Sequence, residues 1–393
     1  MKNRYWTAKR KRVWVLCTAV LIFLTGCRAV DRDNQFEMPS EELATLGETQ
    51  AAEETRETKK ALVSGTDQNG AEDLSVPYQY GNMQSGNFML YGDNQILFER
   101  VDEAGFLLYT LDLDTLEVQL LCQDPSCSHS GGSCVARNKA GNLEQYNGRI
   151  YDLNGTVSAP VAELKGDHFE TILKGSVEKF WHSDGKMYVV TSDRALQCYE
   201  NGSKEGKTIQ DEYLGWGGVV YQNYIYATSF FDYTTFRLNL TEQQPKTEVL
   251  AENAWSKFDV DAGTAYYVDP TTWCLYSCDM TDFSHPTKLT EEGVQWSSIN
   301  FDEDYVYMRP KRDGEFGGDG CHEILRMPKN EPRKLEILAE LPGDPIRSIY
   351  VVPNYDKVFV MTESQTEMGN ANYEFYAVDK DSGKVVELEF PEI

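Results

Sequence analysis

Two kinds of hydrophobic pattern divide the chain. Residues 13–24 form one continuous apolar run, whereas from about residue 85 short runs rich in Tyr, Phe, Val and Ile are broken by Gly, Asn and Asp. Short aromatic and β-branched runs bounded by turn residues predict β-strands joined by tight turns. The stretch from residue 28 to about residue 75 has neither pattern, since it is rich in Glu, Thr, Gln and Gly and nearly free of aromatics. We therefore predict an all-β domain preceded by two segments of other kinds.

The strand pattern repeats along the chain. A strand, a polar turn and a second strand recur seven times, with one aromatic aligned in each second strand: Phe98, Tyr151, Tyr188, Tyr226, Tyr266, Tyr307 and Phe359. Most repeats continue with a third strand of shared signature, as in "LLYTLDLDT", "CLYSCDMTD" and "EFYAVDKDS", and then a fourth strand. Four strands in each unit of forty-odd residues are typical of a β-propeller, whose blades stack around an axis. We predict seven four-stranded blades within residues 76–393. Six or eight are the alternatives, because the second unit is weak.

The N-terminal apolar run predicts a lipoprotein signal peptide over residues 1–26. The first twelve residues carry six Lys or Arg and no acid, and the twelve apolar residues that follow are too few to span a bilayer. Leu24-Thr25-Gly26-Cys27 comes next and resembles the bacterial lipobox, in which the Cys is acylated and becomes the new N-terminus. Acyl chains on Cys27 would anchor the protein to the cell membrane, on its extracytoplasmic face. A plain signal peptide with a chance Cys is the alternative.

Residues 27–75 are predicted to be an acidic, flexible linker, because they cannot bury enough apolar surface to offset the entropy of ordering. Removal of residues 1–26 takes away six of the 37 basic residues and none of the 63 acidic ones, so the mature chain carries 31 − 63 = −32. Such a charge repels phosphate backbones. Nucleic acid is therefore excluded as an expected partner.

Three cysteines and a histidine lie within the thirteen residues "CQDPSCSHSGGSC". Cys122, Cys127, His129 and Cys134 offer three thiolates and an imidazole, which is a standard tetrahedral zinc set, although the spacing departs from paired C-x2-C hooks. Outside the cytoplasm, cysteines also tend to pair as disulfides. A third interpretation is a nucleophilic Cys127 with His129 as its base, for which Asp124 is the one nearby orienting acid. We favour a structural metal or a structural disulfide and leave the two open, with structural zinc as the one candidate cofactor.

Loops on one face of the propeller are the predicted partner site. Connections between blades lie on the same face as the loops that join second to third strands, and binding residues are often found in loops on a rigid scaffold. The candidates for ligand contact are Phe231, Asp232, Tyr233, Trp273, Glu315, Phe316 and Asp319. Exposed aromatics beside acids stack on sugars or hold peptides. The alternative is that these side chains fill gaps between blades.

Several of these features together resemble a class of lipoproteins from Gram-positive, largely clostridial bacteria that carry a TolB-like or YVTN-type β-propeller. The resemblance rests on the "LTGC" lipobox, the acidic spacer, the repeated "LYxLD" third strands and the "CxDPxCxH…C" element, and it covers essentially the whole chain. It implies a fold and a location. It also implies a binding scaffold in the cell envelope, and it supplies no chemistry.

We therefore expect a membrane-tethered, extracytoplasmic β-propeller that binds a protein or glycan partner, and we name no catalytic residue. The alternative class is a propeller-fold polysaccharide lyase or hydrolase. Such an enzyme needs paired carboxylates, or a His, Tyr and Arg group, converging on the central channel. The repeat pattern alone does not show which side chains converge there.

Overall fold

The computed structural model describes residues 88–391 apart from short gaps at 93, 103–104, 130–133, 138–142, 147–148, 154–160, 174, 176, 184, 201–202, 204, 216–217, 230–233, 253–257, 262, 270, 296–298, 313–319, 353–354 and 366–370. All of them belong to one compact unit, Arg56–Ile393. Within these ranges the secondary structure is entirely β, and no helix suited to crossing a membrane is found there. The predicted signal peptide, Cys27 and the predicted linker lie outside the described residues.

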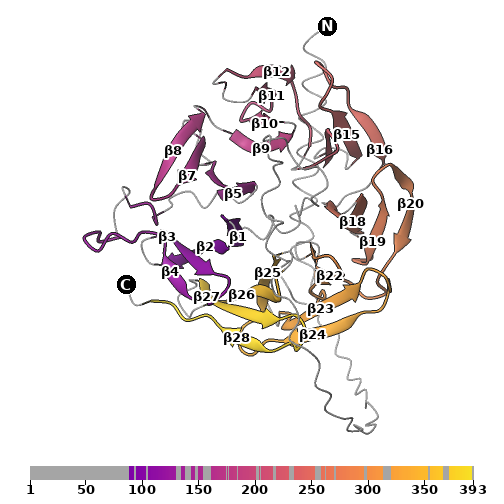
Figure 1. Ribbon diagram of the computed structural model, residues 1–393. Helices are drawn as coiled ribbons and strands as arrows, with labels where there is room; N and C mark the ends of the chain where they lie inside the picture. The colour runs from indigo at the N-terminus through magenta and orange to yellow at the C-terminus, as the bar shows by residue number, and fades with distance from the viewer. Residues whose placement is uncertain are drawn as a thin grey trace, which may run out of the picture. The chain divides into compact units, whose positions relative to one another are not determined.

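The described strands form seven antiparallel sheets of four strands each, arranged as a seven-bladed β-propeller. This confirms the predicted fold, and Figure 1 shows the blades following one another around the axis in chain order. Blades 1 to 3 comprise β1 (Phe88–Tyr91), β2 (Gln95–Asp102), β3 (Gly105–Asp112), β4 (Val118–Leu120), β5 (Leu143–Tyr146), β6 (Arg149–Asp152), β7 (Val161–Lys165), β8 (His168–Leu173), β9 (Val177–Ser183), β10 (Lys186–Thr191), β11 (Leu196–Tyr199) and β12 (Lys207–Gln210). Blades 4 to 7 comprise β13 (Val219–Tyr221), β14 (Tyr224–Thr228), β15 (Thr235–Asn239), β16 (Glu248–Ala251), β17 (Phe258–Asp261), β18 (Thr264–Val268), β19 (Leu275–Asp279), β20 (Asp282–Lys288), β21 (Asn300–Phe301), β22 (Tyr305–Met308), β23 (Glu323–Pro328), β24 (Glu336–Glu340), β25 (Ile346–Val351), β26 (Lys357–Gln365), β27 (Ala371–Asp379) and β28 (Val385–Glu387).

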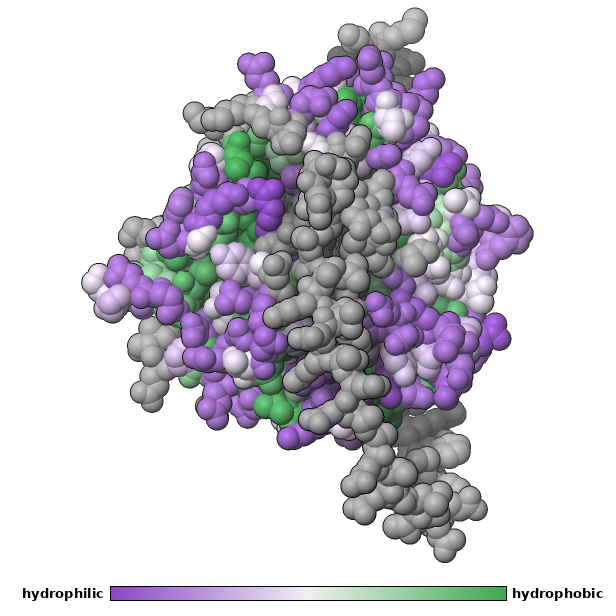
Figure 2. All heavy atoms as spheres, viewed as in Figure 1, coloured by the Kyte–Doolittle hydropathy of each residue, from purple (hydrophilic) through white to green (hydrophobic). Residues whose placement is uncertain are grey.

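The aromatic residue that recurs in the sequence lies in the second strand of every blade, and each one is at most 8% exposed. Because both faces of a blade are covered by its neighbours, these rings are buried between blades. Burial of one such side chain contributes roughly 1.5–3 kcal/mol. Hydrophilic residues cover most of the described surface in Figure 2, where hydrophobic ones show as small, separate patches.

The acid that ends the third-strand signature shapes the turn after it. In blade 7, Asp379 Oδ1 accepts hydrogen bonds from Ser382 N and Oγ, at 2.8 and 2.7 Å. In blade 5, Asp279 Oδ1 accepts them from Thr281 N and Oγ1, at 2.7 and 2.5 Å. A side-chain oxygen that satisfies the backbone two or three residues on favours a tight turn. The acid of the signature therefore marks where the third strand ends in these blades.

Short turns gather at one end of the blades, which we call the turn face. It holds the turns between first and second strands and those between third and fourth strands. Backbone hydrogen bonds join the two kinds of turn, from Leu240 N to Asn223 O and from Lys329 N to Asp304 O, each 2.8 Å long. The same link is found in blades 1, 5 and 7.

The opposite end is the loop face, which holds the connections between blades and the loops from second to third strands. Tyr213 N, between β12 and β13, donates to Arg194 O, between β10 and β11, at 2.7 Å. Val294 N, between β20 and β21, donates to Trp273 O, between β18 and β19, also at 2.7 Å. Each of these connections is thus held against a neighbouring loop.

The ring closes between blade 7 and blade 1 through side chains. Every sheet consists of four consecutive strands, so no described blade combines strands from the two ends of the domain. Rings from both blades meet instead, with Phe98 and Phe375 centroids 5.0 Å apart and Tyr109 and Phe390 centroids 5.1 Å apart. We call this contact the seam. Edge-to-face and tilted ring pairs add about 0.5–1.5 kcal/mol beyond the area that they bury.

Candidate metal centre

The cysteine and histidine cluster lies in the connection between β4 and β5, as predicted from the sequence. The connection starts with a turn in which Asp124 Oδ1 accepts hydrogen bonds from Ser126 N and Oγ, at 2.8 and 2.7 Å. Cys127 N then donates to Asp124 O at 3.1 Å. Asp at the first position and Pro125 at the second favour this turn, because Pro fixes φ and Asp satisfies the backbone. The turn reverses the chain between Cys122 and Cys127.

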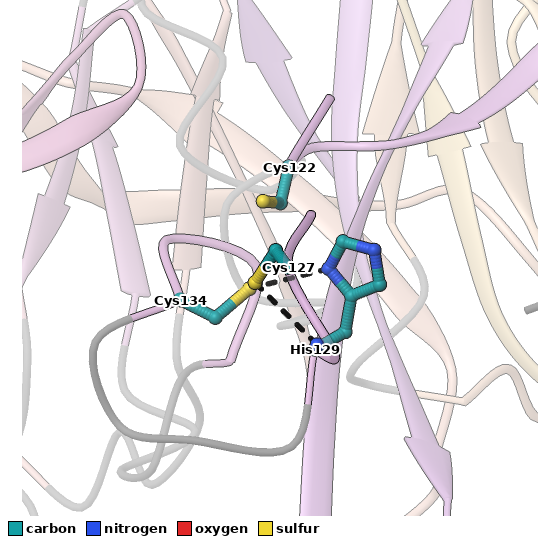
Figure 3. A group of neighbouring side chains, drawn as sticks. All are labelled: Cys122, Cys127, His129 and Cys134. Atoms are coloured by element: carbon teal, nitrogen blue, oxygen red, sulfur yellow. Dashed lines mark hydrogen bonds between the residues drawn. The ribbon is translucent and has the colours of Figure 1, made fainter. Parts of the chain in front are cut away.

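The four side chains point toward one another (Figure 3), and their ligand atoms all lie within 4.8 Å of each other. Cys134 Sγ is 3.5 Å from His129 Nδ1. Tetrahedral zinc, with Zn–S bonds of about 2.3 Å and Zn–N bonds of about 2.0–2.1 Å, separates neighbouring ligand atoms by roughly 3.5–3.8 Å. The pair of Cys134 Sγ and His129 Nδ1 has this spacing, and the other ligand atoms would move closer by up to about 1 Å to bind zinc. Cys122, Cys127 and His129 are half-buried, and Cys134 is buried.

Backbone groups hold the ligands in place. His129 N donates to Cys127 Sγ at 3.4 Å, and this hydrogen bond lowers the pKa of the Cys127 thiol. Burial raises the pKa of the Cys134 thiol to about 11. Arg137 Nε donates to His129 O at 2.9 Å, and His129 has the left-handed φ of 53°. A divalent cation among the four ligands would keep the buried thiol deprotonated, because a coordinating thiol loses its proton outright.

The catalytic interpretation of the cluster fits this geometry less well than metal ligation does. All seven cysteines among the described residues are free thiols. A Cys–His catalytic pair needs the imidazole on the nucleophile. Here His129 Nδ1 lies against the buried Cys134, while Cys127 is contacted by the backbone N–H of His129. The arrangement thus favours ligation over nucleophilic catalysis at Cys127.

Trp273 is the one ligand-face candidate within the described residues. Its backbone has the left-handed φ of 60°, and its side chain packs against the hydrophobic cluster between blades 5 and 6. Lys311 Nζ lies 4.5 Å from the centroid of the ring. The indole is thus held by contacts within the chain. The other candidates lie outside the described residues: Phe231, Asp232, Tyr233, Glu315, Phe316 and Asp319.

One group resembling a catalytic triad was not apparent from the sequence. His285 Nδ1 lies 2.8 Å from both Ser284 Oγ and Asp282 Oδ2. A serine triad instead needs the acid on one ring nitrogen and the hydroxyl on the other. Because both partners share Nδ1, these three residues cannot pass a proton through the imidazole. Asp282, Ser284 and His285 are therefore exposed residues at the start of β20, joined by local hydrogen bonds.

Comparison with known proteins gives similarities of fold alone. No protein-family model matches the chain, and no curated protein matches it. The β-propeller domain of the Trilobed protease from Pyrococcus furiosus is 13% identical, with 77% of this chain and 97% of that chain covered and a TM-score of 0.45. A putative TolB from Agrobacterium tumefaciens is 14% identical, with coverages of 56% and 84% and a TM-score of 0.38. BamB from Moraxella catarrhalis is 10% identical, with coverages of 77% and 86% and a TM-score of 0.39. At such identities neither function nor location follows from the likeness.

Proposed function

We propose that the protein is an extracytoplasmic binding module, tethered to the cell membrane through Cys27, that holds a protein or glycan partner on its loop face. The observation that supports this is the construction of the loop face. Connections between blades and the loops from second to third strands are joined there by backbone hydrogen bonds, such as Val294 N to Trp273 O. Loops fixed on a rigid scaffold are common places for recognition. The turn face, by contrast, consists of short turns.

Site-specific photo-crosslinking in living cells tests which face meets the partner. A crosslinking amino acid replaces Glu212 or Glu292, which are exposed on the loop face, and Glu242 or Asp381, which are exposed on the turn face. We expect adducts from the two loop-face positions and none from the two turn-face positions. Adducts of equal yield from both faces would contradict the proposal. Release of new reducing ends from a cell-surface polysaccharide by the purified chain would favour the lyase or hydrolase instead.

The tether gives a separate prediction. Cys27→Ser is expected to abolish incorporation of labelled palmitate and to move the protein from the membrane fraction to the soluble fraction, because the acyl chains supply the anchor. Cys17→Ser is the matched control, since Cys17 lies within the apolar run of the signal peptide. That variant should remain labelled and membrane-bound. Labelling that survives in the Cys27→Ser variant would contradict the lipid anchor.

We also propose that Cys122, Cys127, His129 and Cys134 bind one structural Zn²⁺. Elemental analysis of the purified full chain should find about one zinc per chain, as a closed site of four protein ligands requires. Cys127→Ser and His129→Ala should each remove it. Cys198→Ser is the control, because Cys198 is a half-buried thiol on β11, outside the cluster. A zinc-free chain that has lost two hydrogens, with its cluster thiols protected from alkylation, would identify a disulfide instead.

A further inference from the structure

The connection that carries the cluster is much longer than the others. It runs over residues 121–142, which is 22 residues, whereas the next longest connection between two blades of the described strands, residues 289–299, has 11. Ordering a long segment costs conformational entropy, and long loops gain most from a cross-link. The ligands are thus placed where a metal has the largest effect on order.

The same connection packs on the blade that forms one side of the seam. Cys134 and Ala136 belong to the hydrophobic cluster that contains Phe98, and Cys122, Cys127 and Phe390 are packed against it. The backbone is joined as well, because Leu108 N donates to Ala136 O at 2.7 Å and Leu121 N donates to Leu108 O at 2.9 Å. Leu108 lies on β3 next to Tyr109, whose ring contacts Phe390. A continuous set of packed groups therefore runs from the metal ligands to blade 7.

Closure of the ring depends on these contacts. No sheet is shared between blade 7 and blade 1, so hydrogen-bonded strands do not hold the two blades together within the described residues. Apart from the rings, Tyr350 Oη accepts a hydrogen bond from Leu90 N at 2.9 Å, and Arg100 stacks over Phe390 at 4.4 Å. Side-chain contacts alone are more readily broken than a strand ladder, so local opening can start at the seam.

We propose that the bound metal keeps the ring closed, acting at the seam in place of a shared strand. This rests on the proposed zinc site. Metal that binds the folded loop and not the unfolded one stabilises whatever packs on that loop. By the reciprocity of linked equilibria, closure of the seam also raises the affinity of the cluster for zinc.

Hydrogen exchange of the full chain, zinc-loaded and after treatment with a chelator, tests the proposal. Zinc content is measured first. Removal of the metal should speed exchange about tenfold or more in peptides that cover β25 and residues 385–391, as expected for local opening at the seam. Peptides that cover β14 and β15, on the far side of the ring, should change less than about twofold. In the reverse direction, Phe390→Ala should weaken zinc affinity several-fold.

Variants and outcomes separate this inference from the zinc site itself. Cys134→Ser should reproduce the effect of the chelator, and Cys278→Ser, which changes a buried thiol on β19, should retain both zinc and protection. Zinc that binds but protects residues 121–143 alone would overturn the seam inference and leave the zinc site intact. Uniformly faster exchange in all blades would also overturn it. A chain that never binds zinc would contradict both the zinc site and the seam inference. Unchanged zinc affinity in Phe390→Ala would contradict the coupling between the seam and the zinc site.

Discussion

Phe98→Ala is expected to lower the free energy of unfolding by about 3–5 kcal/mol, the usual cost of removing a fully buried ring from a packed core. Phe98 is 0% exposed. Its ring lies 5.0 Å from Phe375 of blade 7, 5.8 Å from Phe390 and 5.7 Å from Phe88, measured between centroids. The substitution leaves a cavity that borders both blades of the seam, and the neighbouring rings are held by several strands and cannot collapse into it. Equilibrium urea unfolding measures the loss.

A double-mutant cycle shows whether the rings act together across the seam. Phe98→Ala and Phe375→Ala should couple by about 0.5–1.5 kcal/mol, because each removes the partner of the other. Phe301 is as buried as Phe98 but belongs to a different hydrophobic cluster, so Phe98→Ala and Phe301→Ala should add to within about 0.5 kcal/mol. Val249→Ala, at a position that is 55% exposed, should change stability by less than about 0.5 kcal/mol. If Phe98→Ala and Phe375→Ala were fully additive, the seam would be held by other contacts.

The blades could be predicted from the sequence because their signals are local. An aromatic recurs in every second strand, and an Asp or Asn ends the third strand of blades 1, 4, 5 and 7; each has a physical role within its own blade. Tyr151 is an example, since it lies on β6 as expected even though the second unit lacks the third-strand signature. Strand number and order follow from such repeats without knowledge of any long-range contact.

The geometry of the cluster needed more than its spacing. The donor set was clear from the sequence, but whether the four atoms meet depends on the turn at Asp124 and the left-handed backbone of His129. It also depends on where Ala136 pairs with β3. None of these three structural features can be inferred from the number of residues between Cys122 and Cys134. Spacing therefore indicated the chemistry and left metal and disulfide open.

The seam could not be predicted from the repeat at all. Periodicity indicates that blades exist, and it does not show how the first and last blades meet. Phe390 follows the last strand and belongs to no repeated motif, yet its ring contacts Phe98 and Tyr109 of blade 1. Aromatic residues in loops are equally ambiguous in sequence. Trp273 was a candidate for ligand contact, yet in the structure its side chain packs against the hydrophobic cluster between blades 5 and 6 and against Lys311.

A second long-range feature lies on the turn face, at the residue that directly follows the third strand of a blade. In blades 1, 4 and 5 this residue is apolar and at most 7% exposed, and in blades 6 and 7 it is lysine: Leu113, Leu240, Met280, Lys329 and Lys380. Lys329 pairs with Asp261 of blade 5, and Lys380 Nζ lies 2.9 Å from Asp302 Oδ2 of blade 6. The residue at this position thus forms an ion pair with the neighbouring blade in two blades, and is a buried apolar side chain in three.

Asp302→Asn is expected to lower the free energy of unfolding by about 3–5 kcal/mol, because it leaves the charge of Lys380 buried without its partner. The side chains of Lys380 and Asp302 are 10% and 12% exposed, and burial lowers the pKa of Lys380. Asp302 Oδ2 also accepts a hydrogen bond from Tyr307 Oη at 2.6 Å. An amide nitrogen in that place would face two donors. Adding Lys380→Met should return the stability to within about 1–2 kcal/mol of the native chain, because Met280 fills the same position in blade 5.

The pH dependence gives the same pair a second test. Burial on its own raises the pKa of Asp302, but the charge of Lys380 and the hydrogen bond from Tyr307 outweigh it, so the pKa lies below its usual value. A carboxyl with a lowered folded pKa stabilises the fold above its unfolded pKa of about 3.9, and this contribution is lost as pH falls through the folded pKa. Between neutral pH and about pH 3, the free energy of unfolding measured in urea should therefore fall less steeply in Lys380→Met than in the native chain. Two results would contradict this prediction: equal pH slopes of the free energy of unfolding in the two chains, or an Asp302→Asn variant as stable as the native chain at neutral pH. Either one would mean that Lys380 reaches solvent and that the ion pair does not hold blades 6 and 7 together.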